Sequence, residues 1–174
     1  NSDKTLTQLA EAFGKLAIDY DISSSDNGGI KVVCKEDKSI SGFKCKLSGN
    51  VAEIAYSEIC YCTRAVSLLM AGLVEEGKEV SEKSPFSNYG IMLDCSRNKV
   101  FKVEQVKKWL RRLVMMGYNT VMLYTEDTYE LEGEPFFGYL RGAYTAEELK
   151  EIDDYAFGLG IEMIPCIQVL GHLA

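Results

Sequence analysis

The chain has 174 residues, of which 47% are hydrophobic and 26% are charged, a composition typical of a globular protein that buries a core. Its net charge is −7 and no segment carries a basic stripe, so neither nucleic acid nor an anionic membrane surface is an expected partner. No apolar run approaches the roughly 20 residues that a helix needs to span a bilayer, so no membrane-spanning segment is predicted.

Six cysteines are spread over the chain, most of them inside apolar runs, as is typical of buried free thiols. None forms a C-x-x-C pair, and the only histidine, His172, is distant from most of them in sequence, so neither a zinc site nor another cofactor is predicted. Disulfides need an oxidising compartment and no signal peptide precedes Asn1, so we expect a cytoplasmic protein. The six are Cys34, Cys45, Cys60, Cys62, Cys95 and Cys166.

The first half of the chain predicts a small α+β domain over residues 1–84. Apolar residues at helical spacing predict a first helix and, further along, a second helix that ends near Gly77. Between them lie three predicted strands, residues 30–34, 42–47 and 51–56, and the second alternates apolar side chains with lysines. We therefore expect an antiparallel sheet with helices packed on it. The apolar helix positions are Leu6, Leu9, Phe13, Leu16 and Tyr20, then Ile59, Cys62, Val66, Leu69, Met70 and Leu73.

The second half of the chain has a different pattern. Short apolar runs at residues 90–93, 120–124 and 161–168 predict strands, the first of them buried on both faces. Two amphipathic helices separate the strands, and residues 145–148 form a capping box at the start of the second helix. This alternation predicts parallel pairing in right-handed βαβ units. An open doubly wound sheet and a (β/α) barrel both begin in this way, and periodicity does not separate them.

Polar side chains follow each of the three predicted parallel strands. Ligands of parallel α/β folds bind at the carboxyl ends of the strands, so we expect these side chains to form one polar cup. An arginine and several carboxylates would suit a neutral polyhydroxyl ligand, because both groups hydrogen-bond vicinal hydroxyls well. The residues are Asp94 and Arg97 after the first strand, Glu126 and Asp127 after the second, and Gln168 and His172 after the third.

Most of these residues also have a plainer interpretation. Asp94 and Arg97 have the spacing of a local ion pair that fixes a turn. Glu126 and Asp127 are equally typical of a solvated acidic corner. His172 lies two residues before the last residue of the sequence, and in the plainer interpretation its side chain is simply exposed.

Two further features bear on the cup. Gln168 lies inside an apolar run, where a buried amide needs hydrogen-bond partners. The long loop of residues 125–144 is rich in aromatic side chains, which either stack on the faces of sugars or pack the loop against the protein. These aromatic residues are Tyr129, Phe136, Phe137, Tyr139 and Tyr144.

Three motifs in register resemble glycoside hydrolase family 20. GIMLDCSR at residues 90–97 resembles the first barrel strand of the family, GYNTVMLYTED at 117–127 the second, and PCIQVLGH at 165–172 the third. The likeness covers residues 85–174 and is strongest to a bacterial, intracellular branch of N-acetyl-β-D-glucosaminidases, in which MLYTEDTYE is typical. It implies that this half forms the first three strands and two helices of a TIM (β/α)8 barrel, incomplete in itself, after an accessory domain at residues 1–84.

The resemblance implies roles for the substrate-binding residues. Arg97 would bind the 3- and 4-hydroxyls of a terminal N-acetylhexosamine, either GlcNAc or GalNAc, with Asp94 and Gln168 on the same rim. Three positions depart from the family pattern. Gln168 replaces an acidic residue, Tyr89 replaces an arginine before the first-strand glycine, and Glu126 replaces an aspartate.

The resemblance also implies a supporting network. Glu126 stands where the family usually has an aspartate that pairs with the histidine of the third strand, here His172. Asp127 is the alternative partner. In the family this network steadies the catalytic acid.

The implied activity is removal of terminal N-acetylhexosamine from oligosaccharides with retention of configuration. The 2-acetamido oxygen of the substrate attacks the anomeric carbon, an aspartate orients it, and a glutamate is the general acid and base. That Asp-Glu pair belongs to the fourth barrel strand, and this sequence has no Asp-Glu dipeptide, so we expect the chain alone to be inactive. Open strand edges would favour self-association.

Two other functions stay open. A free-standing, non-catalytic carbohydrate-binding or interaction module would keep Arg97 without the chemistry. If the chain belonged to an unrelated barrel enzyme, all three motif matches would have arisen by chance. A reading frame that continues past Ala174 into a strand ending in Asp-Glu would favour the hydrolase, and a stop codon there would favour the module.

Overall fold

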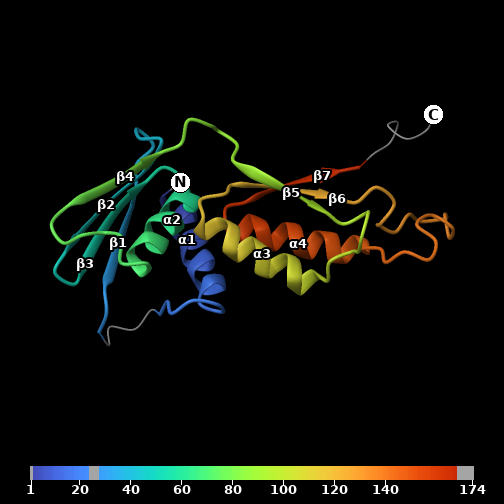
Figure 1. Ribbon diagram of the computed structural model, residues 1–174, viewed down its shortest axis with the longest axis horizontal. Coiled ribbons are helices and arrows are strands. Elements are labelled where there is room, and N and C mark those ends of the chain that lie inside the picture. The colour runs from blue at the N-terminus through green and yellow to red at the C-terminus, as the bar shows by residue number, and fades with distance from the viewer. Residues whose placement is uncertain (1, 24–27, 168–174) are drawn as a thin grey trace.

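The computed structural model describes residues 2–23 and 28–167, which form two sheets flanked by helices (Figure 1). One sheet has four strands in the order β1-β3-β2-β4, and the other has three in the order β5-β6-β7. The elements in chain order are α1 (Ser2–Leu16), β1 (Lys31–Glu36), β2 (Gly42–Ser48), β3 (Val51–Tyr56), α2 (Ile59–Met70), β4 (Glu79–Lys83), β5 (Gly90–Asp94), α3 (Val103–Met115), β6 (Thr120–Tyr124), α4 (Ala146–Gly158) and β7 (Glu162–Cys166).

The first sheet is mixed, so the prediction of an antiparallel sheet is wrong in part. Strand β2 pairs antiparallel with β3, as expected, but its other edge is taken by β4, which was not predicted. Strand β1 is therefore left with the free edge of β3 and runs parallel to it. Strand β4 escaped prediction because its sequence, EVSEK, has one apolar residue and no alternation.

The predicted alternation in β2 is confirmed. Phe43 and Cys45 are buried against the helical side, while Lys44 and Lys46 are exposed. Helix α2 ends at Met70, not near Gly77, because Gly72 adopts a positive φ of 68°. The amide of Leu73 then donates to the carbonyl of Leu68, which closes the helix end in the way that a left-handed glycine allows.

The second sheet is parallel throughout, as predicted. Helices α3 and α4 pack on each other and lie on the same side of the sheet (Figure 1). Leu93, Val121 and Leu123 are buried in the core, whereas Met92 is 54% exposed. The expectation that β5 is buried on both faces is therefore wrong, because helices cover only one of its faces.

The start of α4 forms as the sequence predicts. The hydroxyl of Thr145 accepts a 3.1 Å hydrogen bond from the amide of Glu148, and the Glu148 carboxylate accepts one of 3.0 Å from the amide of Thr145. Both bonds satisfy amides that have no partner within the helix.

The two halves of the chain share one continuous core. Thr63 of α2 donates a 2.8 Å hydrogen bond to the carbonyl of Val114 in α3. Arg111 of α3 is only 6% exposed, and it donates to Asp19, just after α1, and to the hydroxyl of Tyr155 in α4, at 2.7 and 2.9 Å. These polar contacts join helices from both halves. Among the helices of the described residues, none combines the length and apolar character needed to cross a membrane.

Candidate functional site

Strand β5 delivers Asp94 to the carboxyl end of the parallel sheet, where its carboxylate accepts four hydrogen bonds. Oδ1 accepts from the amide and the hydroxyl of Ser96, both at 2.9 Å, and from the amide of Arg97 at 3.2 Å. Oδ2 accepts from Nη1 of Arg97 at 2.9 Å. The Ser96 amide and the Arg97 guanidinium lower the pKa of Asp94 far below its usual value, so this carboxylate stays ionised at neutral pH.

Arg97 is held from two further sides. Its guanidinium lies 5.1 Å from the ring centroid of Tyr124, and Nη2 lies 3.8 Å from Oε1 of Glu126. The hydrogen bond to Asp94 raises the pKa of Arg97, which is thus a fixed cation. More than half of its side chain, 58%, nevertheless remains exposed. The group is therefore oriented and still open to a ligand.

Glu126 follows strand β6 and faces this group. It has a positive φ of 49°, which is uncommon for a residue with a side chain. The hydroxyl of Tyr124 donates a 2.6 Å hydrogen bond to Oε1 of Glu126, and this bond raises the pKa of Tyr124. The structure therefore brings Asp94, Arg97 and Glu126 together, as the sequence predicts, and Asp94 and Arg97 also form the local ion pair of the plainer interpretation.

Asp127 does not join this group. Its Oδ1 accepts a 2.5 Å hydrogen bond from Nη1 of Arg141, in the loop of residues 125–144. Gly138 of the same loop has a positive φ of 64° and packs so closely that an added Cβ would lie 2.3 Å from the carbonyl oxygen of Asp127. Asp127 thus anchors the loop, and the two neighbouring carboxylates have different partners. The interpretation as a merely solvated acidic corner is wrong for both.

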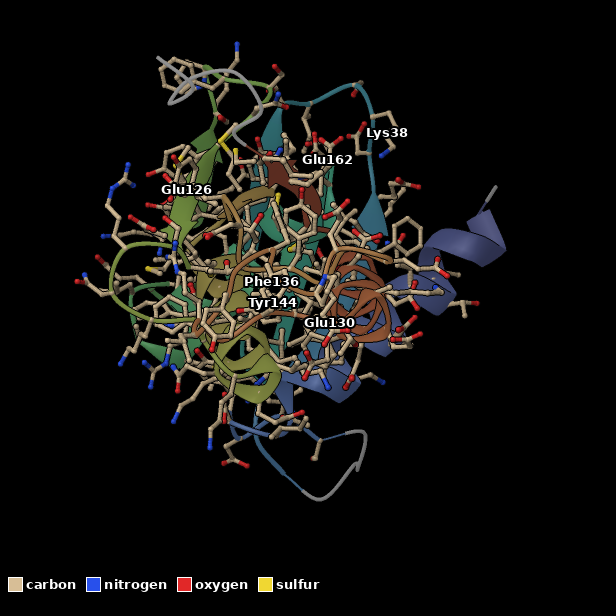
Figure 2. The ribbon with its side chains drawn as sticks, turned by 90° about the vertical axis from the view of Figure 1, so that its right-hand side faces the viewer. Lys38, Glu126, Glu130, Phe136, Tyr144 and Glu162 are labelled. Atoms are coloured by element: carbon tan, nitrogen blue, oxygen red, sulfur yellow. The ribbon has the colours of Figure 1, made fainter. Side chains whose placement is uncertain are left out.

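The aromatic residues of the loop differ in burial, and some of them pack the loop against the protein, whereas stacking on a sugar stays a prediction. Tyr144 is buried and donates a 2.6 Å hydrogen bond to the carbonyl of Phe101, while Tyr129 and Phe137 pack edge to face at 5.1 Å. Phe136 is 80% exposed. Figure 2 looks onto this end of the molecule and labels Phe136, Tyr144 and Glu126. Tyr139 is likewise exposed.

Comparison with known proteins gives one clear result. No family model and no curated protein matches the sequence. Among solved structures, a GH20 exo-β-N-acetylglucosaminidase from Vibrio harveyi matches 92% of this chain with a TM-score of 0.71 and 22% identity. A Streptomyces plicatus N-acetyl-β-hexosaminidase matches 91% of this chain with a TM-score of 0.69 and 19% identity. A Flavobacterium johnsoniae chitobiase matches 93% of this chain with a TM-score of 0.63 and 21% identity. The chain has the fold of the N-terminal region of GH20 enzymes.

The likeness concerns only part of the GH20 structures. The chain spans 31% of the Vibrio enzyme, 39% of the Streptomyces enzyme and 28% of the Flavobacterium enzyme. The mixed α/β fold with two sheets and four helices, counted over residues 2–23 and 28–167, agrees with the GH20 fold predicted from the motifs. At these identities the agreement concerns the fold alone.

Two predicted site residues, Gln168 and His172, lie outside the described residues. The network of Glu126 with His172 and the place of Gln168 on the rim therefore stay predictions. Sequence reasoning missed Tyr124 and Arg141. Tyr124 had a local signal, because it ends strand β6 and precedes Glu126 by two residues, whereas nothing in the sequence links Arg141 to Asp127 across 14 residues.

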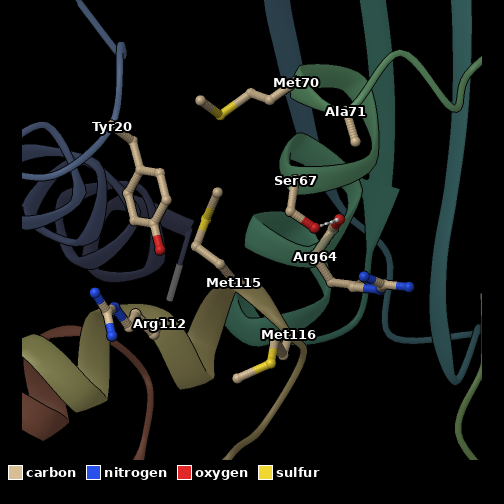
Figure 3. A pocket seen from close by; sticks show the side chains of 8 residues that line it. All are labelled: Tyr20, Arg64, Ser67, Met70, Ala71, Arg112, Met115 and Met116. Atoms are coloured by element: carbon tan, nitrogen blue, oxygen red, sulfur yellow. Dashed lines mark hydrogen bonds between the residues drawn. The ribbon is translucent and has the colours of Figure 1, made fainter.

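Other ligand sites are poorly supported. In the part of the chain that the structure describes, no three His, Cys, Asp or Glu side chains gather as a metal site requires. An open, largely apolar hollow lies between α2 and α3 (Figure 3). It adjoins the C-terminal end of α3, which is opposite to the end of the sheet that carries Arg97. Its lining residues are Tyr20, Arg64, Ser67, Met70, Ala71, Arg112, Met115 and Met116.

Proposed function

We propose that this chain is the N-terminal part of a GH20-type glycoside hydrolase that removes terminal N-acetylhexosamine, GlcNAc or GalNAc, from oligosaccharides. The observation that carries the proposal is the group formed by Asp94, Arg97 and Glu126 at the carboxyl end of a sheet with the GH20 fold. The Vibrio and Streptomyces neighbours include complexes with N-acetylglucosamine, which supports a carbohydrate partner.

The arrangement suits recognition of sugar hydroxyls. A guanidinium offers several N–H donors in one plane, and two of them can reach neighbouring hydroxyls of a pyranose at once. Asp94 fixes one side of Arg97 and Tyr124 supports its face, so little side-chain freedom is lost when a sugar binds. The Glu126 carboxylate beside them accepts hydrogen bonds only. We assign Arg97 to the 3- and 4-hydroxyls, with Asp94 and Gln168 on the same rim.

We assign the supporting network to Glu126 and not to Asp127. Glu126 shares its carboxylate with the Arg97 group, whereas Asp127 is tied to Arg141. In the proposed enzyme Glu126 pairs with His172 and steadies the general acid.

The second sheet supports the start of a (β/α)8 barrel. Its strands follow chain order and both crossover helices lie on one side, as right-handed βαβ units give in a barrel and in one half of a doubly wound sheet, and the likeness to GH20 structures favours the barrel. Met92, Met122 and Ile164 lie in register across the sheet, and Met92 is exposed on the face without helices, as expected for a barrel interior that further strands would cover. We propose domains at residues 1–84 and 85–174.

The proposed reaction is substrate-assisted. The acetamido oxygen of the sugar attacks the anomeric carbon with retention, and an Asp-Glu pair on a further strand orients that oxygen and transfers the proton. The sequence has no Asp-Glu dipeptide, so we propose that the chain alone does not hydrolyse glycosides. All six cysteines are free thiols, which favours action in the cytoplasm.

Two measurements on the 174-residue chain test the proposal. The first is titration with chitobiose followed by NMR or calorimetry. Arg97→Lys keeps the charge and loses the planar fork, so we expect its affinity to fall at least about tenfold. Arg112→Lys, at an exposed position near the hollow, is the matched control and should bind as the wild type does. Equal binding by wild type and Arg97→Lys would remove the physical basis of the assignment.

The second measurement is hydrolysis of a chromogenic GlcNAc glycoside. We expect none from the chain alone and turnover from a product of a reading frame that continues to an Asp-Glu strand. If the chain binds the sugar and the reading frame stops at Ala174, the protein is a carbohydrate-binding module instead.

A further inference from the structure

Three cysteines of the first half gather where its sheet meets α2. Cys34 of β1 and Cys45 of β2 both pair with Ile54 of the intervening strand β3, so they lie on the same face of the sheet. Cys62 of α2 packs onto this face and is completely buried, as is Cys45. Cys34 is only partly buried. The cluster therefore has one member that small solutes can reach.

Two of these thiols are in direct contact. Sγ of Cys62 donates a hydrogen bond to Sγ of Cys34, and the sulfurs are 3.4 Å apart. A disulfide has an S–S length of about 2.04 Å, so the sulfurs need to approach by roughly 1.4 Å. Among the strands that the structure describes, β1 is at the edge of its sheet and pairs only with β3. It can make this small shift without breaking a second set of strand hydrogen bonds.

The thiols differ in reactivity. The hydrogen bond from Cys62 lowers the pKa of Cys34, whereas the same bond and burial raise the pKa of Cys62. Burial raises the pKa of Cys45 to about 11. The thiolate is the nucleophilic form of cysteine. Cys34 thus combines exposure with the greater thiolate character, and Cys62 is placed to resolve an oxidised Cys34.

We propose that Cys34 and Cys62 form an oxidation site, at which a hydroperoxide converts the two thiols into a disulfide that joins β1 to α2. The Cys34 sulfur attacks the peroxide oxygen, the O–O bond breaks, and a sulfenic acid and an alcohol (water, for hydrogen peroxide) result. The Cys62 sulfur then attacks the Cys34 sulfur. The S–O bond breaks, and the hydroxyl leaves as water with the Cys62 proton. The two thiols lose two electrons, and the peroxide gains them.

The proposal is independent of the glycosidase assignment, and the reduced chain tests it directly. The chain is treated with a small excess of hydrogen peroxide, blocked with N-ethylmaleimide and digested with trypsin without reduction. We expect the count of free thiols to fall from six to four. We also expect a cross-linked peptide that joins residues 32–35 to residues 47–64, with fragmentation placing the link at Cys62 and not at Cys60.

Matched variants decide between pairs of cysteines. Cys45→Ala removes the third thiol of the cluster and should form the same link as the wild type. After peroxide treatment, Cys34→Ala should keep all of its free thiols. Circular dichroism shows whether the alanine disturbs the fold, and in that case Cys34→Ser replaces it as the second variant. The proposal is overturned if the wild type keeps six thiols, if Cys34→Ala still loses two, or if the link uses Cys45.

Discussion

The hydroxyl of Tyr124 donates a 2.6 Å hydrogen bond to the carboxylate of Glu126, and the ring of Tyr124 lies under the guanidinium of Arg97. One side chain thus supports both the cation and the anion of the candidate site. Tyr124 ends strand β6, and Glu126 follows two residues later with a positive φ of 49°, so the bond lies within the short segment where the chain leaves the sheet.

Removal of the Tyr124 hydroxyl separates these two roles. Tyr124→Phe keeps the ring under Arg97 and loses the donor to Glu126. We expect the dissociation constant for chitobiose to rise by roughly two- to tenfold, the range for one accessible hydrogen bond. Calorimetry measures the change, and Tyr139→Phe, at an exposed loop position, is the control that should not alter it. An unchanged constant for Tyr124→Phe would mean that Glu126 needs no such support.

The depressed pKa of Asp94 predicts a pH dependence of stability. A carboxyl whose folded-state pKa is below its usual value of 3.8 stabilises the fold above that value, and this contribution is lost as the pH falls through the folded-state pKa. We expect Asp94→Asn to lower the thermal midpoint at pH 7, and the difference from wild type to shrink below about pH 4. Melting curves from pH 7 to pH 2 measure it. A difference that is the same at both ends of the range contradicts the prediction.

The close contact at Gly138 predicts a large effect of a small substitution. Gly138→Ala would place a Cβ 2.3 Å from the carbonyl oxygen of Asp127 at a positive φ, and we expect a cost of about 1–3 kcal/mol in the free energy of unfolding. Gly133 also has a positive φ, of 83°, but an added Cβ would meet nothing within 4 Å. Gly133→Ala therefore isolates the backbone strain. Urea unfolding should show a larger loss in the free energy of unfolding for Gly138→Ala than for Gly133→Ala. A protease should also cut the loop of residues 125–144 sooner in Gly138→Ala.

The buried arginine between the two halves predicts a strong dependence of stability on one side chain. Arg111→Met keeps most of the apolar stem but leaves Asp19 and Tyr155 without their partner, at a cost of about 1–3 kcal/mol. The neighbouring Arg112 is exposed, so Arg112→Met should change the free energy of unfolding by less than about 0.5 kcal/mol. Equal effects of the two variants in urea unfolding would show that the contact contributes little.

The uncovered face and the unpaired edges of the second sheet predict self-association of the chain. Strands β5 and β7 each pair only with β6 among the described strands. On the face without helices, Met92 of β5 is 54% exposed to solvent. We expect the apparent mass in sedimentation to rise with concentration and Met92→Lys to weaken this rise. Met116→Lys, at a methionine of similar exposure, is the control. A chain that stays monomeric up to high concentration contradicts the prediction.

Features set by short stretches of sequence could be predicted. The capping box of Thr145 and Glu148, the alternation around Cys45 and the delivery of Asp94 and Arg97 to a strand end all depend on residues close in the chain. Periodicity and the preference for ligands at strand ends are sufficient to find them.

Features that depend on contacts between distant residues could not be predicted from the sequence. Strand β1 pairs in parallel with β3 because β4 already pairs with the other edge of β2, and the sequence of β4 has almost no apolar pattern. The separation of Asp127 from Glu126 depends on Arg141, which is 14 residues away. Here tertiary contacts decide between local alternatives that the sequence leaves equal.

The contact of Arg111 with Asp19 and Tyr155 also has a bearing on protein synthesis. Asp19 leaves the ribosome well over a hundred residues before Tyr155, so this junction closes only when α4 has emerged. The four-stranded sheet and α2 consist of residues that are made earlier, and α2 offers α3 a packing surface, whereas α1 finds its partner only when α4 is present. The first half would thus serve the second as an internal template, on which a nascent parallel sheet is assembled strand by strand.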